Sequence, residues 1–260
     1  MAAPVEKGNI VVAIFYDFET GGFDCNINAA TQISLHAVRL DTFEVMEKYQ
    51  SYIYPYNKKA DINKPKRKVL KNKYDIEDDE ELMVYGEAAL DVSGITMDLL
   101  YKQGKPLEDV CNEICDFIER NTFPVVASNK PFMIGQNPLF DNGFMQQIML
   151  YTGVWARFIK LVRGAKDYWG NFQPTQLDTI LLSQLTFDND KSITTWKLEA
   201  MAERLGIDLD DAHDADADVT ATREIVRVLT ARMRSQSAGG IEVGGLTAEK
   251  REKLRDHFKI

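Results

Sequence analysis

Two acidic residues, separated by a single position, end an apolar stretch near the start of the chain. Residues 10–16 are all apolar, and Asp17 and Glu19 follow on either side of Phe18. In a β-strand, residues two positions apart point to the same face, so the two carboxylates would stand side by side. Unpaired neighbouring carboxylates repel each other and lose hydration on burial. Residues 10–20 contain no Lys or Arg, so a divalent metal ion is the simplest positive partner.

Two further acids and one histidine occupy positions where side chains could join such a site. Asp141 lies among apolar neighbours, shortly after an Asn137-Pro138 pair that predicts a helix start with an N-cap and a first-turn proline. Asp218 follows His213 by five residues, at the start of a helix that we predict from residue 217 to about residue 233.

Together these residues form three motifs that resemble those of the DEDDh family of 3′–5′ exonucleases. The motifs are D-x-E-T-G at residues 17–21, N-x-x-F-D at residues 137–141 and H-x-x-x-x-D at residues 213–218, followed by Ala-Thr. This DnaQ-like family includes the proofreading epsilon subunit of bacterial DNA polymerase III, RNase T and oligoribonuclease. The resemblance covers roughly residues 9–232 and implies an α/β, RNase H-like fold, a mixed five-stranded sheet flanked by helices. Gln136 departs from the pattern, since relatives often carry His there.

The resemblance implies roles for the motif residues. Two Mg²⁺ or Mn²⁺ ions would be held by carboxylates, with Asp17 bridging both ions; the four ligands are Asp17, Glu19, Asp141 and Asp218. His213 would take the proton from the attacking water, for which its ordinary pKa of about 6.5 is suited. The residues implied in binding the last nucleotide are Thr20, Gly21, Gly22 and Asn137.

Neighbouring residues compete for some of these roles. Asp211, Asp214 and Asp216 are alternatives to Asp218, but the offset from His213 and the following Ala-Thr favour Asp218. We therefore expect the other three to be solvated loop residues, and His36 and His257 to be ordinary surface or strand histidines.

The resulting functional hypothesis is a metal-dependent 3′–5′ exonuclease that releases nucleoside 5′-monophosphates from single-stranded 3′ ends. DNA is the favoured substrate, in proofreading or DNA processing, and a 3′–5′ exoribonuclease is the alternative. A non-catalytic nucleic-acid-binding module on the same fold is a second alternative, although it predicts a lost motif residue. An unrelated metal-dependent phosphoesterase is disfavoured, because such sites use several His ligands and the chain has only three His.

Composition excludes some classes of protein. The formal net charge of −9 over 260 residues argues against a basic nucleic-acid coat, though not against an enzyme acting on nucleic acid. The three cysteines lack C-x-x-C spacing, which disfavours disulfide scaffolding and a thiolate zinc site. No apolar run reaches membrane-spanning length, and the first residues lack a signal-peptide core. We expect a cytoplasmic protein without membrane contact.

The rest of the chain is divided by its patterns. We expect an exonuclease domain over residues 1–234, with an irregular insertion at 56–95, and a flexible linker with a short terminal helix over residues 235–260. That last segment raises the possibility of a DNA polymerase partner. The insertion carries eight basic residues between Lys58 and Lys73 and then an acidic run. It is either a self-neutralising loop or a phosphate-contacting arm.

Periodicity predicts the individual elements. The expected strands are residues 31–40, 43–54 and 124–128, and the expected helices include residues 107–120, 177–185 and 196–205. Aromatic residues alternate with cations between residues 154 and 172, which suits either core packing or base stacking.

Overall fold

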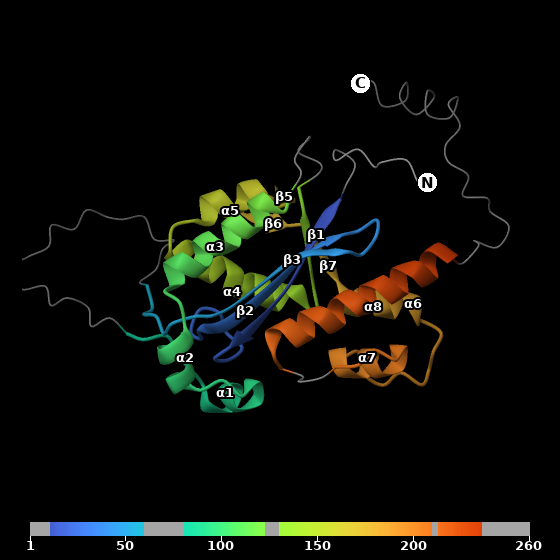
Figure 1. The fold of residues 1–260 in the computed structure, drawn as a ribbon, viewed down its shortest axis with the longest axis horizontal. Helices are drawn as coiled ribbons and strands as arrows, with labels where there is room; N and C mark the ends of the chain where they lie inside the picture. Colours follow the sequence, from blue (N-terminus) through green and yellow to red (C-terminus); the bar gives the residue numbers. More distant parts are fainter. Residues whose placement is uncertain (1–10, 60–80, 123–129, 210–212, 236–260) are drawn as a thin grey trace, which may run out of the picture.

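A mixed five-stranded sheet, in the order β3-β2-β1-β4-β7, forms the centre of the computed structural model (Figure 1). The structure describes residues 11–59, 81–122, 130–209 and 213–235. The strands of the sheet are β1 (Val12–Thr20), β2 (Ala30–Arg39), β3 (Val45–Tyr52), β4 (Phe132–Gly135) and β7 (Gln176–Asp178). The expected α/β class and the mixed five-stranded sheet are confirmed.

β1 is the middle strand and determines what each face of the sheet carries. It pairs antiparallel with β2, which pairs antiparallel with β3, and it pairs parallel with β4. Because side chains alternate along a strand, Ile14 and Tyr16 enter one core, while Ala13 and Phe15 enter the other. Both faces of β1 are therefore buried, which explains its continuous apolar run.

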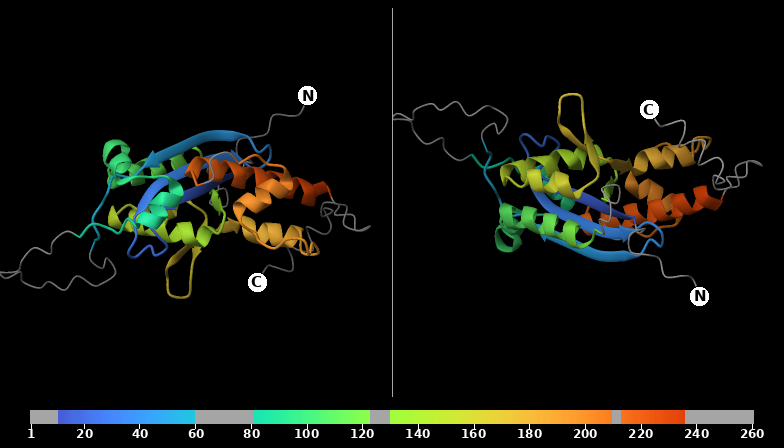
Figure 2. Two further views of the ribbon diagram at one scale, coloured as in Figure 1. Left: turned by 90° about the horizontal axis from the view of Figure 1, so that it is seen from below. Right: turned by 90° about the horizontal axis from the view of Figure 1, so that it is seen from above.

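Helices cover both faces of the sheet (Figures 1 and 2). One face carries α3 (Leu107–Arg120), α4 (Pro138–Tyr151) and α5 (Trp155–Leu161). The other face carries α6 (Thr179–Thr186), α7 (Leu198–Leu205) and α8 (Ala215–Ser235). Within the described ranges, no helix is long and apolar enough to span a membrane.

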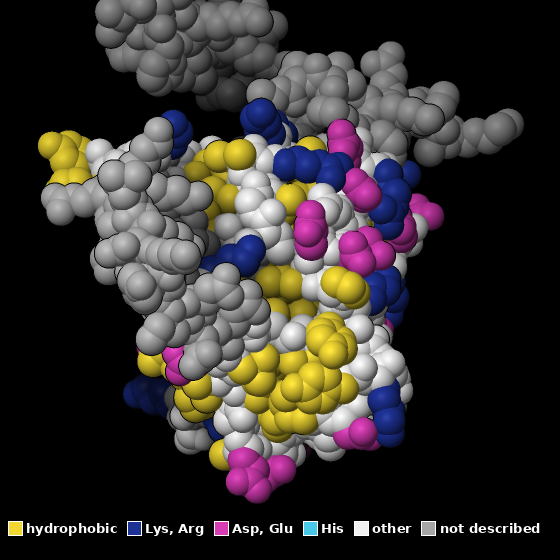
Figure 3. Space-filling view, turned by 90° about the vertical axis from the view of Figure 1, so that its left-hand side faces the viewer, with side chains coloured by type: hydrophobic (Ala, Val, Ile, Leu, Met, Phe, Trp, Pro, Cys, Tyr) yellow, Lys and Arg dark blue, Asp and Glu magenta, His cyan; other side chains and the backbone are white. Residues whose placement is uncertain are grey.

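Two short helices between β3 and α3 have a small core of their own. α1 (Glu87–Ser93) and α2 (Met97–Gln103) enclose a cluster of buried apolar residues, Leu90, Ile95 and Leu100. Apolar side chains also reach the surface of this part of the molecule, including Val92 and Tyr101. Hydrophobic side chains gather on the lower part of the face shown in Figure 3. The described second half of the 56–95 segment, residues 81–95, is thus more regular than the sequence suggested.

Several predicted elements need correction. Residues 177 and 178 begin no helix; they belong to β7, which pairs with β4 before α6 starts at Thr179. The predicted strand 43–54 is shorter, because a turn and an irregularity in pairing delay β3 until Val45. The predicted strand 124–128, most of the basic run and the 235–260 tail (apart from Ser235) lie outside the described residues.

Side chains whose role the sequence left open are now placed. Cys111 and Cys115 are buried in the core beneath α3, as their helical spacing predicted. In the aromatic segment, Phe158 is buried in the same core. Tyr168 and Trp169 are instead 92% and 81% exposed, in the turn between β5 (Gly164–Lys166) and β6 (Phe172–Pro174), which pair as a two-stranded sheet. The segment therefore combines core packing with an exposed aromatic tip.

A pair of Leu→Ala substitutions tests the two-sided burial of the sheet. Leu35 of β2 has no exposed surface, whereas Leu185 of α6 is 68% exposed. We expect Leu35→Ala to lower the free energy of unfolding by about 2–5 kcal/mol, because it removes buried methyl groups and leaves a cavity. Leu185→Ala should leave it almost unchanged. Urea unfolding measures both, and equal effects would contradict the described core.

Candidate active site

Three carboxylates from two elements meet at the end of β1. Asp17 and Glu19 lie two positions apart on β1, and Asp218 projects from the first turn of α8. One carboxylate oxygen from each lies within 4.8 Å of the others. The side-by-side arrangement of Asp17 and Glu19 follows from the period of two in a strand. It points both side chains to the face covered by α8.

Asp141 approaches the same strand end from the opposite helix layer. It lies in the first turn of α4, as predicted, and is only 3% exposed. Its Oδ1 accepts a hydrogen bond of 3.0 Å from the backbone N–H of Phe18. Asp141 does not belong to the group of three within 4.8 Å. It is nevertheless close enough to Asp17 to raise the pKa of that carboxyl.

Burial and mutual repulsion raise the pKa of every carboxyl in this site. Burial is the largest cause at Asp17, whose pKa is well above its usual range. Its acidic neighbours, Asp141 foremost, raise this pKa further. The pKa of Glu19 is raised to about 8 by burial and then by Asp218. Burial raises the pKa of Asp218 to about 6, against the charge and a backbone hydrogen bond of His213. Such a cluster of hard oxygen ligands is suited to binding a divalent cation.

His213 lies beside this group, and its imidazole is also close to Glu199 of α7. Its Nε2 is 3.9 Å from Oε1 of Glu199, and its side chain is 46% exposed. Both residues line a pocket of about 510 Å³, together with Gln136 and Trp196. The backbone of His213 is left-handed, with φ of 75°. The structure therefore brings His213 next to Asp218, although His213 is not among the residues whose ligand atoms lie within 4.8 Å of one another.

The residues implied in nucleotide binding make structural contacts at the same edge of the sheet. Thr20 Oγ1 donates to the carbonyl of Gly22 at 2.8 Å. A Cβ at Gly21 would lie only 2.6 Å from the carbonyl oxygen of Val84, so the loop after β1 packs directly on that segment. These contacts fix the loop but do not test the expected nucleotide contacts.

Asn137 and Gln136 make contacts that the sequence did not predict. Asn137 is the N-cap residue of α4 and Pro138 follows in the first turn, as predicted, but Asn137 has a left-handed backbone and its side chain makes no capping hydrogen bond. Its backbone N–H instead donates to Asp178 at 3.1 Å. Gln136 donates to the carbonyl of Trp196 at 2.8 Å and bonds to Thr179. It therefore holds β4 against the α6–α7 layer.

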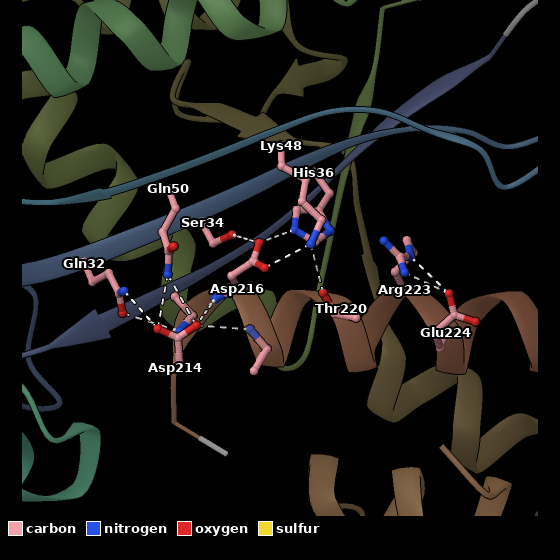
Figure 4. Close-up of polar contacts among 12 residues, drawn as sticks. Gln32, Ser34, His36, Lys48, Gln50, Asp214, Asp216, Thr220, Arg223 and Glu224 are labelled. Atoms are coloured by element: carbon pink, nitrogen blue, oxygen red, sulfur yellow. Dashed lines mark hydrogen bonds and ion pairs between the residues drawn. The ribbon is translucent and has the colours of Figure 1, made fainter. Parts of the chain in front are cut away.

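Sequence analysis missed the roles of Asp214 and Asp216. The structure places both at the start of α8, where they contact side chains of β2 and β3 (Figure 4). The expectation that they are solvated loop residues is wrong. A pattern in the sequence pointed to their partners: Gln32, Ser34 and His36 alternate with the apolar residues Ile33, Leu35 and Ala37.

Comparisons with known proteins identify the fold. No protein-family model and no curated protein matches the chain. Among solved structures, E. coli exonuclease I in complex with a dT13 oligonucleotide is 18% identical, with a TM-score of 0.59 over 86% of this chain and 42% of that one. The chain shares the fold of E. coli exonuclease I.

Two other structures of exonuclease I give the same result. A complex of the E. coli enzyme with a dA16 oligonucleotide is 19% identical, with a TM-score of 0.59, covering 86% of this chain and 42% of that one. A product-bound structure of exonuclease I is also 19% identical, with a TM-score of 0.57, covering 86% and 44%. The chain thus spans less than half the length of the exonuclease I chains it matches.

The raised carboxyl pKa values predict that the metal-free protein loses stability as pH rises. The folded state holds protons at Glu19 and Asp218 that the unfolded state releases near pH 4. The free energy of unfolding should therefore fall between about pH 4 and pH 8. Asp17→Asn, which removes one of the repelling charges, should raise it at pH 8 by about 1–3 kcal/mol in EDTA.

The control and the metal-bound protein complete this experiment. Asp91→Asn, at an exposed position of α1, should have little effect. Mg²⁺ or Mn²⁺ should restore the stability of the unchanged chain at pH 8, because a cation offsets the repulsion. Thermal or urea unfolding measures each case. A free energy of unfolding that rises from pH 5 to pH 8 in EDTA would contradict the described electrostatics.

Proposed function

We propose that this chain is a metal-dependent 3′–5′ exonuclease that releases nucleoside 5′-monophosphates from single-stranded 3′ ends, with DNA as the favoured substrate. The observation that carries the proposal is the group of Asp17, Glu19 and Asp218 at the end of β1, on the fold of exonuclease I. The order of the three motifs, which resemble the DEDDh motifs, supports it independently. The DNA oligonucleotides in the exonuclease I complexes favour DNA over RNA.

The chemistry of the site's donors fits Mg²⁺ or Mn²⁺, of which the proposed mechanism uses two. Burial and four neighbouring carboxyl groups, that of Asp141 foremost, all raise the pKa of Asp17, which is the electrostatic environment that a bound cation relieves. The residues that would hold the ions are Asp17, Glu19, Asp141 and Asp218. When bound, the ions would activate the attacking water, neutralise charge at the phosphorus and stabilise the leaving 3′ oxygen.

The protein's own groups then have distinct tasks. His213 acts as the general base, accepting the proton of the attacking water at an imidazole nitrogen. For this its ring leaves Glu199, from which it is separated by 3.9 Å, and turns toward Asp218. Asp141 keeps its hydrogen bond to the Phe18 backbone and so holds its second oxygen toward the end of β1. The loop of Thr20, Gly21 and Gly22, with Asn137, receives the terminal nucleotide.

Experiments distinguish the proposed function from the alternative substrates and partners. An exoribonuclease would use the same carboxylates. It would differ from the proposed enzyme only in preferring ribose to deoxyribose in its substrate. A non-catalytic binding module would bind oligonucleotides without cleaving them. A polymerase partner, bound through the 235–260 segment, is proposed on the expected linker and terminal helix alone.

Digestion of matched oligonucleotides tests the activity and the sugar preference together. With Mg²⁺ or Mn²⁺, we expect single-stranded DNA with a free 3′ end to be shortened faster than RNA of the same sequence, releasing 5′-monophosphates. Asp17→Asn should abolish turnover, because it removes a carboxylate that would hold the metal ions, whereas Asp91→Asn should not. Chromatography of the products measures both. If both DNA and RNA remained intact after incubation, the non-catalytic binding module would be the better hypothesis.

Substitution of His213 separates its proposed role from that of a metal ligand. His213→Ala should lower kcat about 10²- to 10⁴-fold, the usual contribution of a general base. Mn²⁺ affinity, measured by the electron paramagnetic resonance signal of free Mn²⁺, should stay the same. A loss of Mn²⁺ binding would make His213 a ligand, and an unchanged kcat would remove it from the mechanism.

A further inference from the structure

A row of buried polar side chains lies on β2, directly beside the carboxylates of β1. Gln32, Ser34 and His36 occupy alternate positions and are at most 1% exposed. They face α8, since Ser34 lies opposite Asp17 and Gln32 opposite Glu19 in the antiparallel register. Buried polar groups in a core require partners. Their partners identify what the row does.

Asp216 of α8 contacts two members of this row and also Lys48 of β3 (Figure 4). Its Oδ1 accepts from Ser34 Oγ at 3.2 Å and lies 2.5 Å from Nε2 of His36. Its Oδ2 accepts from Nζ of Lys48 on β3 at 2.9 Å. Burial lowers the pKa of His36 to about 4, so the ring is neutral at pH 7. A neutral ring donates to a carboxylate only from the protonated nitrogen, which assigns the proton to Nε2.

Asp214 links the same turn of the helix to the sheet. Its Oδ1 caps α8 by accepting from the backbone N–H groups of Asp216 at 3.0 Å and Ala217 at 3.3 Å. Its carboxylate also accepts from the side-chain amides of Gln32 and Gln50, each at 3.1 Å to Oδ2. The first turn of α8 is therefore bound to both β2 and β3.

These contacts surround the position from which Asp218 projects. Asp218 donates its backbone N–H to the carbonyl of Asp214 at 3.0 Å, so it belongs to the turn that the sheet holds. Its carboxylate meets Asp17, the cross-strand neighbour of Ser34. Apolar residues of similar size often stabilise a fold at least as well as a charged network that is removed from water, and this network is partly removed from it. Directional polar contacts instead specify one position of the helix.

We propose that Asp216, held by Ser34, His36 and Lys48, is a positioning residue that fixes Asp218 against Asp17 and Glu19 and thereby sets the affinity of the site for its divalent cation. The inference rests on the proposed function, since it assigns a cation to those carboxylates. Asp216 itself touches neither cation nor substrate. It acts through the helix turn that carries Asp218.

Mn²⁺ titration of the full chain tests this role, with free Mn²⁺ followed by electron paramagnetic resonance. Asp216→Ala removes the acceptor, and His36→Leu removes one donor while filling the buried volume. Each should weaken Mn²⁺ binding about 10-fold, the lower range for residues that orient metal ligands. His36→Gln keeps an N–H donor near the position of Nε2 and should bind Mn²⁺ as the unchanged chain does. Nuclease activity of Asp216→Ala should recover in excess Mn²⁺.

A matched control separates positioning from general stability. Glu224→Ala removes another carboxylate of α8, whose ion pairs within the described ranges are with Arg223 and Arg227 of the same helix. It should leave Mn²⁺ affinity unchanged even where urea unfolding shows lower stability. Asp216 is 30% exposed at its side chain, so its substitution does not disturb a fully buried position.

The possible failures can be told apart. Unchanged Mn²⁺ affinity in folded Asp216→Ala overturns the positioning role and leaves the proposed nuclease intact. Equal loss in His36→Gln and His36→Leu also overturns it, because the hydrogen-bond donor is then irrelevant. Absence of Mn²⁺ binding and of cleavage by the unchanged chain overturns the proposed function and this inference together.

Discussion

Repulsion among partly buried carboxylates at the end of β1 is the constraint on which the rest of the structure depends. The pKa of Glu19, raised to about 8, shows how unfavourable its charged form is in the metal-free protein. Such a group persists only where stronger interactions hold its members in place. Two apolar cores, one on each face of β1, supply that support. The acids therefore occupy a strand that is packed on both faces.

The three elements that bring acids to this place are fixed by different kinds of contact. β1 is held by strand pairing on both sides. The start of α4 is attached by the hydrogen bond from Phe18 to Asp141. α8 is attached by the polar row of β2, through Asp214 and Asp216. The two helices thus approach one strand end from opposite faces of the sheet, each held by a carboxylate that accepts a hydrogen bond.

How much was predictable depended on how local each feature is. The pairing of Asp17 with Glu19 follows from the two-residue period of one strand, and the place of Asp141 follows from a helix start a few residues away. β7 was missed because three residues are too few to show a period. The contacts of Asp216 join residues 168 and 180 positions apart, which no local pattern contains. The proximity of His213 to Glu199 likewise joins residues of different elements.

The register between β1 and β2 has a consequence for folding fidelity. A slip of one residue turns every side chain of a strand to the opposite face. In the observed register Asp17 lies opposite Ser34, on the side of α8. After such a slip the two acids would enter the apolar core beneath α3 and α4, where Ile14, Tyr16 and Phe18 now lie. The carboxylates lower the stability of the correctly paired sheet, but they would lower that of the misaligned sheet far more. The same residues therefore favour the correct alignment of the strands.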